Sequence, residues 1–418
     1  MRRRARFDSD RPRAQSEAPH LLVIVENVPF SVDTRLRKQV GSLLEAGYRV
    51  SVITRHDEGN SIYRSVPRLR LLEYPTPREG KGPLGYFVEY GVSLSAAFVL
   101  SLRVCLREKV DVVQFCQPPD VYFPLAWLLR AFGSKILVDQ RDLMPEVYAA
   151  RFGHAGPLTR RLFRRLAYWN YRAAHGVLCV NGYLETYALE AGASPSAVTI
   201  IRNGPVLSRI DRATPDPALR NAQTFLCCWI GKMGRQDRLD LLLAVADRLV
   251  HGLGRTDWHL AILGDGECLE ETKATAARLG LEPWITFTGW VPEEVVFQYL
   301  VTSDLGLDAS LQGEVSPVKA MEYMGASLPF AAFDLPETRA IAGGAAILTP
   351  PGDVEGLASS VSALLDDAGL RKVMGRCGRK RVADELAWEH QGSTYLDAVD
   401  RLARRVSSGN RTSGRIPA

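Results

Sequence analysis

The stretch FLCCWIGKMGRQDRLDLLL, residues 225–243, contains the repeating unit of the fold. An apolar run of strand length leads into a turn that contains Gly231 and Gly234, and leucines at helical spacing follow. The same order of apolar run, turn and helical pattern recurs along nearly the whole chain. Because strands that alternate with helices pair in parallel, the sequence predicts α/β sheets built from βαβ units.

Outward from residue 225, the strand-like runs fall into two series. The C-terminal series comprises residues 225–230, 258–264, 285–289, 304–308, 329–333 and 345–349, and the N-terminal series comprises 21–25, 48–54, 111–115, 135–139, 176–180 and 198–202. With 418 residues, the chain is also too long for one hydrophobic core. We therefore predict two doubly wound, Rossmann-like domains.

The predicted domain boundaries follow local composition. Residues 1–19 are predicted to be a disordered basic arm, because they are polar and lack the apolar segment of a signal peptide. Residues 206–223 are rich in Pro, Asp and Arg and have no periodicity, which is typical of a linker. The first domain then spans 20–205 and the second spans 224–400, and 401–418 is predicted as a tail.

The net charge of +5 conceals two unlike halves. Residues 1–20 carry 6 Lys/Arg and 3 Asp/Glu, residues 21–210 carry 24 and 16, and residues 211–418 carry 22 and 28. The three parts therefore contribute +3, +8 and −6 to the net charge. The basic first half favours anionic partners. Nucleic acid is disfavoured as that partner, because no recognition motif accompanies the charge.

The seven cysteines are odd in number, form no C-x-x-C pair and mostly lie inside apolar runs. This pattern predicts buried, reduced thiols in a cytoplasmic protein and argues against a zinc site, which needs clustered Cys and His ligands. The most apolar stretch, residues 86–102, is interrupted by Glu89 and by serines and is short for a membrane span. It is predicted to be a buried or interfacial helix.

Loops that follow strands are the candidate sites, because ligands of open parallel sheets bind at the carboxyl ends of the strands. After residues 225–230, Gly231 and Gly234 allow close backbone approach, Lys232 and Arg235 add positive charge, and a helix is predicted to begin near Arg238. Such a loop can hold phosphate, although a plain strand-to-helix turn has the same pattern.

A second glycine turn, with Gly264 and Gly266, follows residues 258–264. Leu269 stands where the third glycine of a G-x-G-x-x-G fingerprint would be. A nicotinamide-dependent dehydrogenase is therefore disfavoured.

The third loop, LDASLQGEVSPVKAMEYMGASLPF (307–330), is the most informative. Ser316 followed by Pro317 is a typical N-cap and first-turn pair, which predicts a helix to about Met324 with its amides at the strand ends. Lys319 and Glu322 then share one face of this helix. A diphosphate would suit the helix N-terminus, and a carboxylate deeper in the helix would suit a ribose diol. The alternative is an ordinary capped helix with solvated charges.

These motifs resemble those of a known family. Glu314 and Glu322, separated by seven residues, with SPVKAMEYMGASLPF (316–330), resemble the donor-sugar motif of family 4 retaining glycosyltransferases of the GT-B fold. The resemblance covers about residues 20–400 and is to bacterial enzymes that assemble O-antigen, exopolysaccharide or related glycoconjugates. It extends over ENVPFSVDTRLRKQVGSLLEAGYRVSVIT (26–54), QPPDVYFPLAWLLRAFGSKILVDQRDLMPEVYAARF (117–152), IIRNGPVLSR (200–209), MGRQDRLDLLL (233–243) and FDLPETRAIAGGAAILTPPGD (333–353).

The resemblance implies two Rossmann-like domains that face a cleft, with a nucleotide-sugar donor bound by the C-terminal domain and the acceptor bound by the N-terminal domain. Glu322 would hold the ribose hydroxyls, Glu314 and the amides of residues 315–318 would contact the donor sugar, and Lys232 would stabilise the leaving diphosphate. The implied sites are catalytic (Glu314, Lys232, Arg141), donor-binding (Gly231, Gly234, Arg235, Arg238, Gly264, Val315, Ser316, Pro317, Val318, Lys319, Glu322) and acceptor-side (Asp33, Arg35, Asp142).

The sequence departs from the family pattern in both halves. The family's lysine and glycine after the glycine loop are here Asp237 and Arg238, and an aspartate cannot stabilise a diphosphate. We therefore predict that Arg235, Arg238 or Lys319 supplies the missing positive charge. In the first half, Arg141 and Asp142 stand where many relatives have a catalytic histidine. The alternative for Asp142 is a cap on a helix over residues 143–148.

The implied reaction is glycosyl transfer with retention through an oxocarbenium-like state, in which a phosphate oxygen of the leaving group accepts the proton. No metal or other cofactor is expected. The alternatives are a nucleotide-sugar 2-epimerase or phosphorylase on the same fold, and a non-catalytic, membrane-peripheral relative.

The expected acceptor is a glycan, a lipid-linked sugar or a small molecule. GPLTRRLFRRLAYWNYRAA (156–174) interleaves arginines with aromatic and apolar residues, which predicts a helix on an anionic membrane surface, at the inner face of the cell membrane. A helix packed inside the domain with a solvated basic face would have the same sequence.

Overall fold

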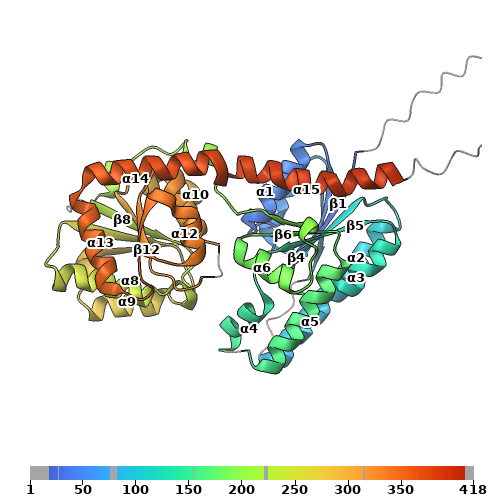
Figure 1. The fold of residues 1–418 in the computed structure, drawn as a ribbon, viewed down its shortest axis with the longest axis horizontal. Coiled ribbons are helices and arrows are strands. Elements are labelled where there is room, and N and C mark those ends of the chain that lie inside the picture. The colour runs from blue at the N-terminus through green and yellow to red at the C-terminus, as the bar shows by residue number, and fades with distance from the viewer. Residues whose placement is uncertain are drawn as a thin grey trace, which may run out of the picture.

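The computed structural model describes residues 18–26, 28–75, 82–153, 155–220, 225–313 and 316–409. It contains two α/β domains, each built around one parallel sheet with helices on its faces (Figure 1). The predicted fold class is confirmed. Within the described ranges, no helix is both long enough and apolar enough to cross a membrane.

The N-terminal sheet has seven parallel strands in the order β3-β2-β1-β4-β5-β6-β7. Their bounds are β1 (His20–Ile24), β2 (Arg49–Arg55), β3 (Leu69–Tyr74), β4 (Val112–Gln117), β5 (Lys135–Gln140), β6 (Gly176–Cys179) and β7 (Val198–Ile200). Strand β3 was not predicted. This edge strand is only partly buried, so Arg70 and Glu73 interrupt the apolar run that marks the central strands.

Helices cover both faces of this sheet. They are α1 (Thr34–Glu45), α2 (Gly82–Cys105), α3 (Phe123–Ala131), α4 (Met144–Phe152), α5 (Pro157–Ala173) and α6 (Gly182–Glu190). Leu36 and Val40 of α1 belong to one core cluster, whereas Ala97 of α2 and Leu125 of α3 belong to another. The stretch predicted as a buried or interfacial helix lies within α2, and the stretch predicted as a basic helix is α5.

The C-terminal sheet has six parallel strands in the order β10-β9-β8-β11-β12-β13, and all six were predicted. They are β8 (Phe225–Ile230), β9 (Trp258–Leu263), β10 (Ile285–Gly289), β11 (Leu305–Asp308), β12 (Phe330–Phe333) and β13 (Ala346–Thr349). The helices are α8 (Leu239–Asp247), α9 (Leu269–Arg278), α10 (Glu293–Thr302), α11 (Val318–Gly325), α12 (Pro336–Ala342), α13 (Val354–Asp366) and α14 (Ala368–Arg381). All seven cysteines are free, and Cys377 is exposed, unlike the buried thiols that we expected.

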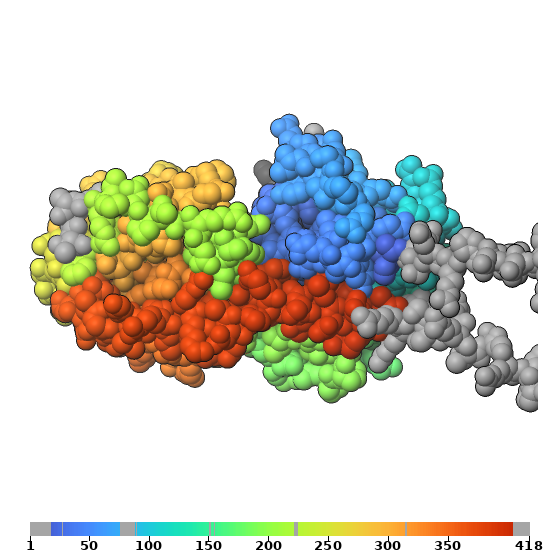
Figure 2. Space-filling view, turned by 90° about the horizontal axis from the view of Figure 1, so that it is seen from above, coloured from blue at the N-terminus to red at the C-terminus, as the bar shows by residue number. Residues whose placement is uncertain are grey.

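The last helix, α15 (Trp388–Gly409), returns to the N-terminal domain. Trp388, Tyr395 and Leu402 are buried in the N-terminal core beside residues of α1. Figure 2 shows this C-terminal segment, in red, running along both domains. Residues up to 400 were predicted to belong to the second domain, and the remainder to a tail. The apolar stripe of α15 instead completes the core under the first sheet.

The chain crosses between the domains twice, and the two crossings lie side by side. The amide of Trp388 donates to the carbonyl of Pro205 over 2.8 Å. A Cβ atom added to Gly204 would meet the Leu386 carbonyl oxygen at 1.6 Å. Between the crossings and the C-terminal sheet, α7 (Leu207–Ile210) places Ile210 in the C-terminal core. The predicted linker therefore begins as part of a tightly packed joint.

Candidate active site

Three glycine loops meet at the carboxyl ends of β8, β9 and β10. The Gly231 amide donates to Leu263 O and the Gly264 amide donates to Gly289 O, each over 3.0 Å. Gly231 has φ 152° and Gly264 has φ 138°, values that side chains rarely allow. A Cβ on Gly264 would lie 1.8 Å from the Gly231 carbonyl oxygen. The sequence thus places two predicted donor-site glycines in direct backbone contact.

Gly264→Ala is expected to lower the free energy of unfolding by about 3 kcal/mol, because it adds both backbone strain and a clash with Gly231. Gly280→Ala is the matched control, since Gly280 has φ 66° with open space around its Cβ position. It is expected to cost about 1 kcal/mol. Urea denaturation measures both values, and equal losses would contradict the close approach of the loops.

Lys319 lies at the centre of this edge. Its Nζ is 3.0 Å from Asp237 Oδ1 and 3.4 Å from Asp308 Oδ1, and it stands 4.6 Å from the centroid of the Trp229 ring. Burial lowers the pKa of Lys319, but Asp308 and Asp237 outweigh it and raise this pKa above its ordinary value. The side chain is only 14% exposed, so a charged ammonium is held in place beside the Gly231 loop.

The other predicted cations are less buried than Lys319. Arg238 has φ 50° and its guanidinium pairs with Asp240 at 2.8 and 2.7 Å on the same turn. Lys232 and Arg235 are exposed, and Gly234 N donates to Asp237 Oδ2 over 3.3 Å. Of the three residues proposed to replace the family's lysine, Lys319 is the one that contacts Asp237.

Helix α11 begins at Val318, two residues after the predicted cap. Pro317 occupies the N-cap position without a side-chain cap, so the prediction that Ser316 caps the helix is wrong. Pro317 has ψ 71°, outside the helical range, so the helix cannot begin at the predicted first-turn position. The Ser316 hydroxyl is buried without a hydrogen-bond partner among the described residues. Glu314 and Val315 lie outside the described residues.

Glu322 lies one turn further along α11 and faces the joint between the domains. Burial raises the pKa of Glu322 to about 7, against the opposing charge of Lys38 on α1. Lys38 Nζ donates to the carbonyl of Gly204 over 2.7 Å and lies 5.0 Å from the Trp388 ring centroid. A residue of the N-terminal domain therefore lowers the pKa of a predicted donor-site carboxylate, although burial outweighs it.

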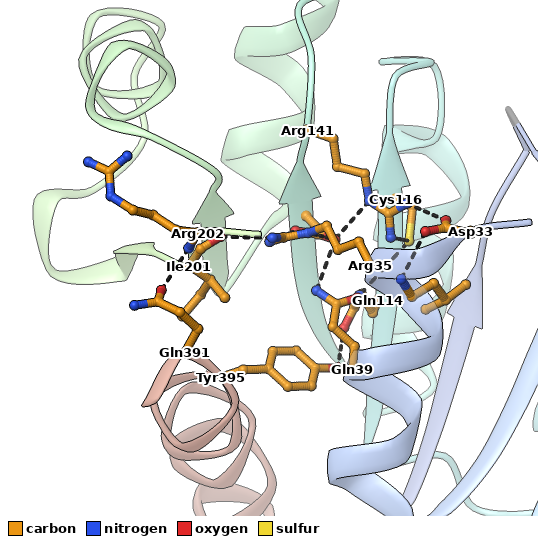
Figure 3. Close-up of polar contacts among 12 residues, drawn as sticks. Asp33, Arg35, Gln39, Gln114, Cys116, Arg141, Ile201, Arg202, Gln391 and Tyr395 are labelled. Carbon is orange, nitrogen blue, oxygen red and sulfur yellow. Dashed lines mark hydrogen bonds and ion pairs between the residues drawn. The ribbon is translucent and has the colours of Figure 1, made fainter. Parts of the chain in front are cut away.

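In the N-terminal domain, Arg141 is part of a buried ion cluster at the ends of β4 and β5 (Figure 3). Its Nε donates to Asp139 Oδ2 over 2.9 Å, its Nη1 pairs with Asp33, and its Nη2 lies 3.1 Å from Cys116 Sγ. Arg35 binds Asp139 through two nitrogens, at 2.8 and 3.2 Å. The predicted acceptor-side residue Asp33 thus holds Arg141 directly, and Arg35 does so through Asp139.

The same cluster reaches α15 and the interdomain joint. Gln39 joins Asp139 to Gln114, and the Tyr395 hydroxyl donates to Gln114 Oε1 over 2.7 Å. Arg35 Nη1 also donates to the carbonyl of Ile201 over 2.8 Å. Figure 3 shows these side chains converging from α1, β4, β5 and α15.

Asp142, the last predicted acceptor-side residue, is exposed, and its carbonyl accepts a hydrogen bond from Gln140 over 2.6 Å. The alternative prediction that Asp142 caps the next helix is wrong, because Leu143 occupies the N-cap position of α4. The chain needs one more extended residue before Pro145 can enter the first turn.

Asp139→Asn is expected to lower the free energy of unfolding by about 3 kcal/mol, because it leaves two buried guanidinium groups without their shared anion. Burial raises the pKa of Asp139, but Arg35 and Arg141 outweigh it and hold this pKa well below its ordinary value. The ionised carboxylate therefore stabilises the fold above the ordinary aspartate pKa, and this stability is lost as the pH falls through the folded pKa.

Denaturation at pH 7 tests this prediction. Asp366→Asn is the control, since the Asp366 side chain is 69% exposed and its pairing with Arg255 is worth less than about 1 kcal/mol. Similar stabilities for the two variants would show that the cluster is energetically neutral.

Glu337, at the start of α12, bridges the two domains and was not predicted. Its Oε1 accepts hydrogen bonds from the amides of Gly182 and Tyr183 at 3.0 and 3.2 Å, and its Oε2 lies 2.8 Å from Arg202 Nη1. The carboxylate thus caps α6 of the other domain, and the loops after β6 and β12 meet. The contact joins residues 135 or more positions apart, which local sequence patterns do not reveal.

Two family models match the chain. A "Glycosyl transferase 4-like domain" matches residues 32–204, and "Glycosyl transferases group 1" matches residues 224–367. Together they cover most of both Rossmann-like domains. The protein is a GT-B glycosyltransferase. This glycosyltransferase has Lys319, Glu322 and the glycine loops inside the second match, and the Arg141 cluster inside the first.

Known proteins are similar along most of the chain. A 2-deoxystreptamine glucosyltransferase of Streptomyces kanamyceticus is 29% identical over 86% of this glycosyltransferase and 96% of its own length. A sulfoquinovosyl transferase of Arabidopsis thaliana is 22% identical over 88% of this chain and 71% of its own.

Solved structures share the fold. Sucrose-phosphate synthase from Thermosynechococcus elongatus superposes with a TM-score of 0.73 at 16% identity, over 94% of this chain and 100% of its own. An Anabaena protein solved with UDP and glucose superposes with a TM-score of 0.70 at 14% identity, over 91% of this chain and 99% of its own.

Proposed function

We propose that the protein is a retaining, family 4 glycosyltransferase that uses a nucleoside diphosphate sugar in the synthesis of cell-surface glycoconjugates. The observation that carries this proposal is the buried Lys319 ammonium beside the Gly231 and Gly264 loops, with Glu322 on the same helix. A buried cation beside a glycine loop suits a diphosphate, and a nearby carboxylate suits a ribose diol. The UDP complex of the Anabaena protein makes UDP the first donor nucleotide to test.

In this proposal the C-terminal domain stabilises the leaving group. As the bond between sugar and diphosphate breaks, negative charge develops on the diphosphate, and a fixed ammonium and backbone amides stabilise it without reorganising. Lys319 supplies the buried charge, and exposed Lys232 adds a second cation at the mouth of the loop. The proposed mechanism includes no divalent metal, and Glu314 and residues 315–318 would contact the donor sugar.

The acceptor side of the proposal is the N-terminal domain. Arg141, held by Asp33 and Asp139, would present a fixed guanidinium edge to the acceptor or the transferred sugar. A phosphate oxygen of the leaving group would take the proton of the attacking hydroxyl, so that no protein base is required. We expect a glycan, a lipid-linked sugar or a small molecule as acceptor, with the enzyme working in the cytoplasm.

Nucleotide binding tests the proposal. UDP, GDP and dTDP at millimolar concentration should be compared for their effect on the melting temperature, and at least one is expected to raise it, because a ligand that binds only the folded state stabilises it. Uridine, which lacks the diphosphate, is the matched control for UDP. If none of the three diphosphates shifts the melting temperature, the proposed donor site is wrong. If one of them does, nucleotide sugars with that base should be screened, and slow hydrolysis of one of them would identify the donor sugar.

A further inference from the structure

Helices α2, α3 and α5 form one continuous layer on the N-terminal domain, on the side away from α1 and α15 (Figure 1). Residues of α2 and α3 share a core cluster. Tyr90 of α2 and Phe163 of α5 belong to another, and the rings of Trp127 on α3 and Trp169 on α5 are 5.5 Å apart. The three helices therefore present one outward surface.

This surface is unusually apolar. In the described part of the chain, 17 large hydrophobic side chains are exposed, and nine of them lie on these three helices or directly after them. Val92, Val99 and Leu106 are spaced by seven residues, so they form a stripe along α2. Leu158 on α5 is 79% exposed. Such a concentration of exposed apolar side chains marks an interaction surface.

The same surface is strongly basic. The sequences of the three helices contain seven arginines and a single acidic residue, Glu89. Arg161 and Arg164 on α5 are exposed, and the guanidinium of Arg165 lies 5.5 Å from the Trp169 ring centroid. Apolar and aromatic side chains between arginines suit the interface of a bilayer with anionic headgroups.

We infer that the outward face of α2, α3 and α5 docks on an anionic lipid bilayer. A second copy of the chain is a poorer occupant, because a two-fold symmetric contact would place two strongly basic faces against each other. The inference adds a partner to the proposed function and uses residues outside the donor site. The surface includes α5, the helix that the sequence predicts to lie on a membrane, and extends it with α2 and α3.

Cosedimentation of the full-length protein with vesicles tests the inference. Vesicles of phosphatidylcholine with phosphatidylglycerol are expected to bind the protein, and pure phosphatidylcholine vesicles are not. Arg161→Glu with Arg164→Glu should weaken binding about thirtyfold or more, because each arginine at an anionic surface contributes about fivefold. Lys372→Glu with Arg376→Glu, at exposed positions of α14, makes the same charge change elsewhere and should have little effect.

A second double variant, Val92→Ser with Val99→Ser, tests the apolar stripe and should also weaken binding to the anionic vesicles. Equal binding to both kinds of vesicle, or wild-type binding by either α2 or α5 variant, would overturn the inference. An absence of binding to the anionic vesicles would also overturn it. If the protein is then a dimer that Val92→Ser with Val99→Ser dissociates, the surface is a contact between two copies of the chain. Because no donor is present in the assay, its result does not depend on whether the donor site is correct.

Discussion

Lys319→Ala is expected to reduce kcat for glycosyl transfer or donor hydrolysis by about 10²- to 10³-fold, the usual cost of removing one fixed group that stabilises transition-state charge. The ammonium contacts Asp237 and Asp308 and lies against the Trp229 ring, so its position is fixed before the donor binds. Initial rates at saturating donor measure the effect, and melting curves establish that the variant is folded.

Relocating the lysine separates a catalytic role from a structural one. Asp237 Oδ1 is 3.0 Å from Lys319 Nζ, so a lysine at position 237 can bring its ammonium to nearly the same place. The double variant Asp237→Lys with Lys319→Ala is therefore expected to recover at least about tenfold over Lys319→Ala alone, since most of the electrostatic stabilisation returns.

Arg238→Ala is the matched control for this series. Because Arg238 pairs with Asp240 on its own turn, its removal should change kcat by less than about threefold. A larger loss in Arg238→Ala than in Lys319→Ala would show that the charge comes from Arg238. A folded Lys319→Ala enzyme with wild-type kcat would remove Lys319 from the mechanism.

Glu322→Gln is expected to weaken donor binding about 10²- to 10³-fold, because hydrogen bonds from two ribose hydroxyls to a charged carboxylate are each worth about 1.5–3 kcal/mol. The pH dependence is equally informative. Burial raises the pKa of Glu322 from 4.5 to about 7, so the ionised form that accepts both hydroxyls becomes the major form only as the pH rises through this value. Donor affinity of the wild type should therefore rise between about pH 6 and pH 8.

Folding stability should change in the opposite direction. Because the folded pKa of Glu322 lies above its unfolded value, its contribution to stability is fully present below pH 4.5 and is lost as the pH rises through about 7. Glu322→Gln removes this loss, so the variant should melt at a higher temperature than the wild type at pH 8. Higher stability with weaker binding is typical of a residue kept for function.

Titration calorimetry with UDP at pH 6 and pH 8 measures the predicted affinities, and melting curves at pH 8 measure the predicted difference in stability. The phosphate of UDP titrates in the same range, but it does so for both proteins, so the difference between wild type and Glu322→Gln isolates the carboxylate. Equal affinities, or equal pH dependence in the two proteins, would show that Glu322 does not hold the ribose.

The fold could be predicted where side-chain burial alone shapes the sequence. The central strands β8, β9, β11 and β12 of the C-terminal sheet are mostly apolar and buried, because helices cover both of their faces. Strand β3 was missed because an edge strand keeps polar residues such as Arg70. The destination of α15 was missed because an amphipathic pattern shows that a helix packs on something but not on which sheet.

The candidate site could be predicted only in part for the same reason. Glycine turns and a helix after β11 follow from local chemistry, and the structure places Lys319 and Glu322 on that helix. That Lys319 rather than Arg238 meets Asp237 depends on the packing of α11 against β8 and on the left-handed turn at Arg238. The role of Glu337 depends on the contact between two domains, and no local pattern encodes it.

The return of α15 links the two ends of the chain during synthesis. The N-terminal sheet is complete once residue 200 has left the ribosome, but part of the face that α1 packs against stays uncovered until Trp388 and Tyr395 follow. Part of the apolar surface of the first domain therefore stays exposed, where chaperones can bind it, while the whole second domain is synthesised. A chain that loses its last helix through a premature stop would lack part of its N-terminal core, even though the second domain had been translated in full.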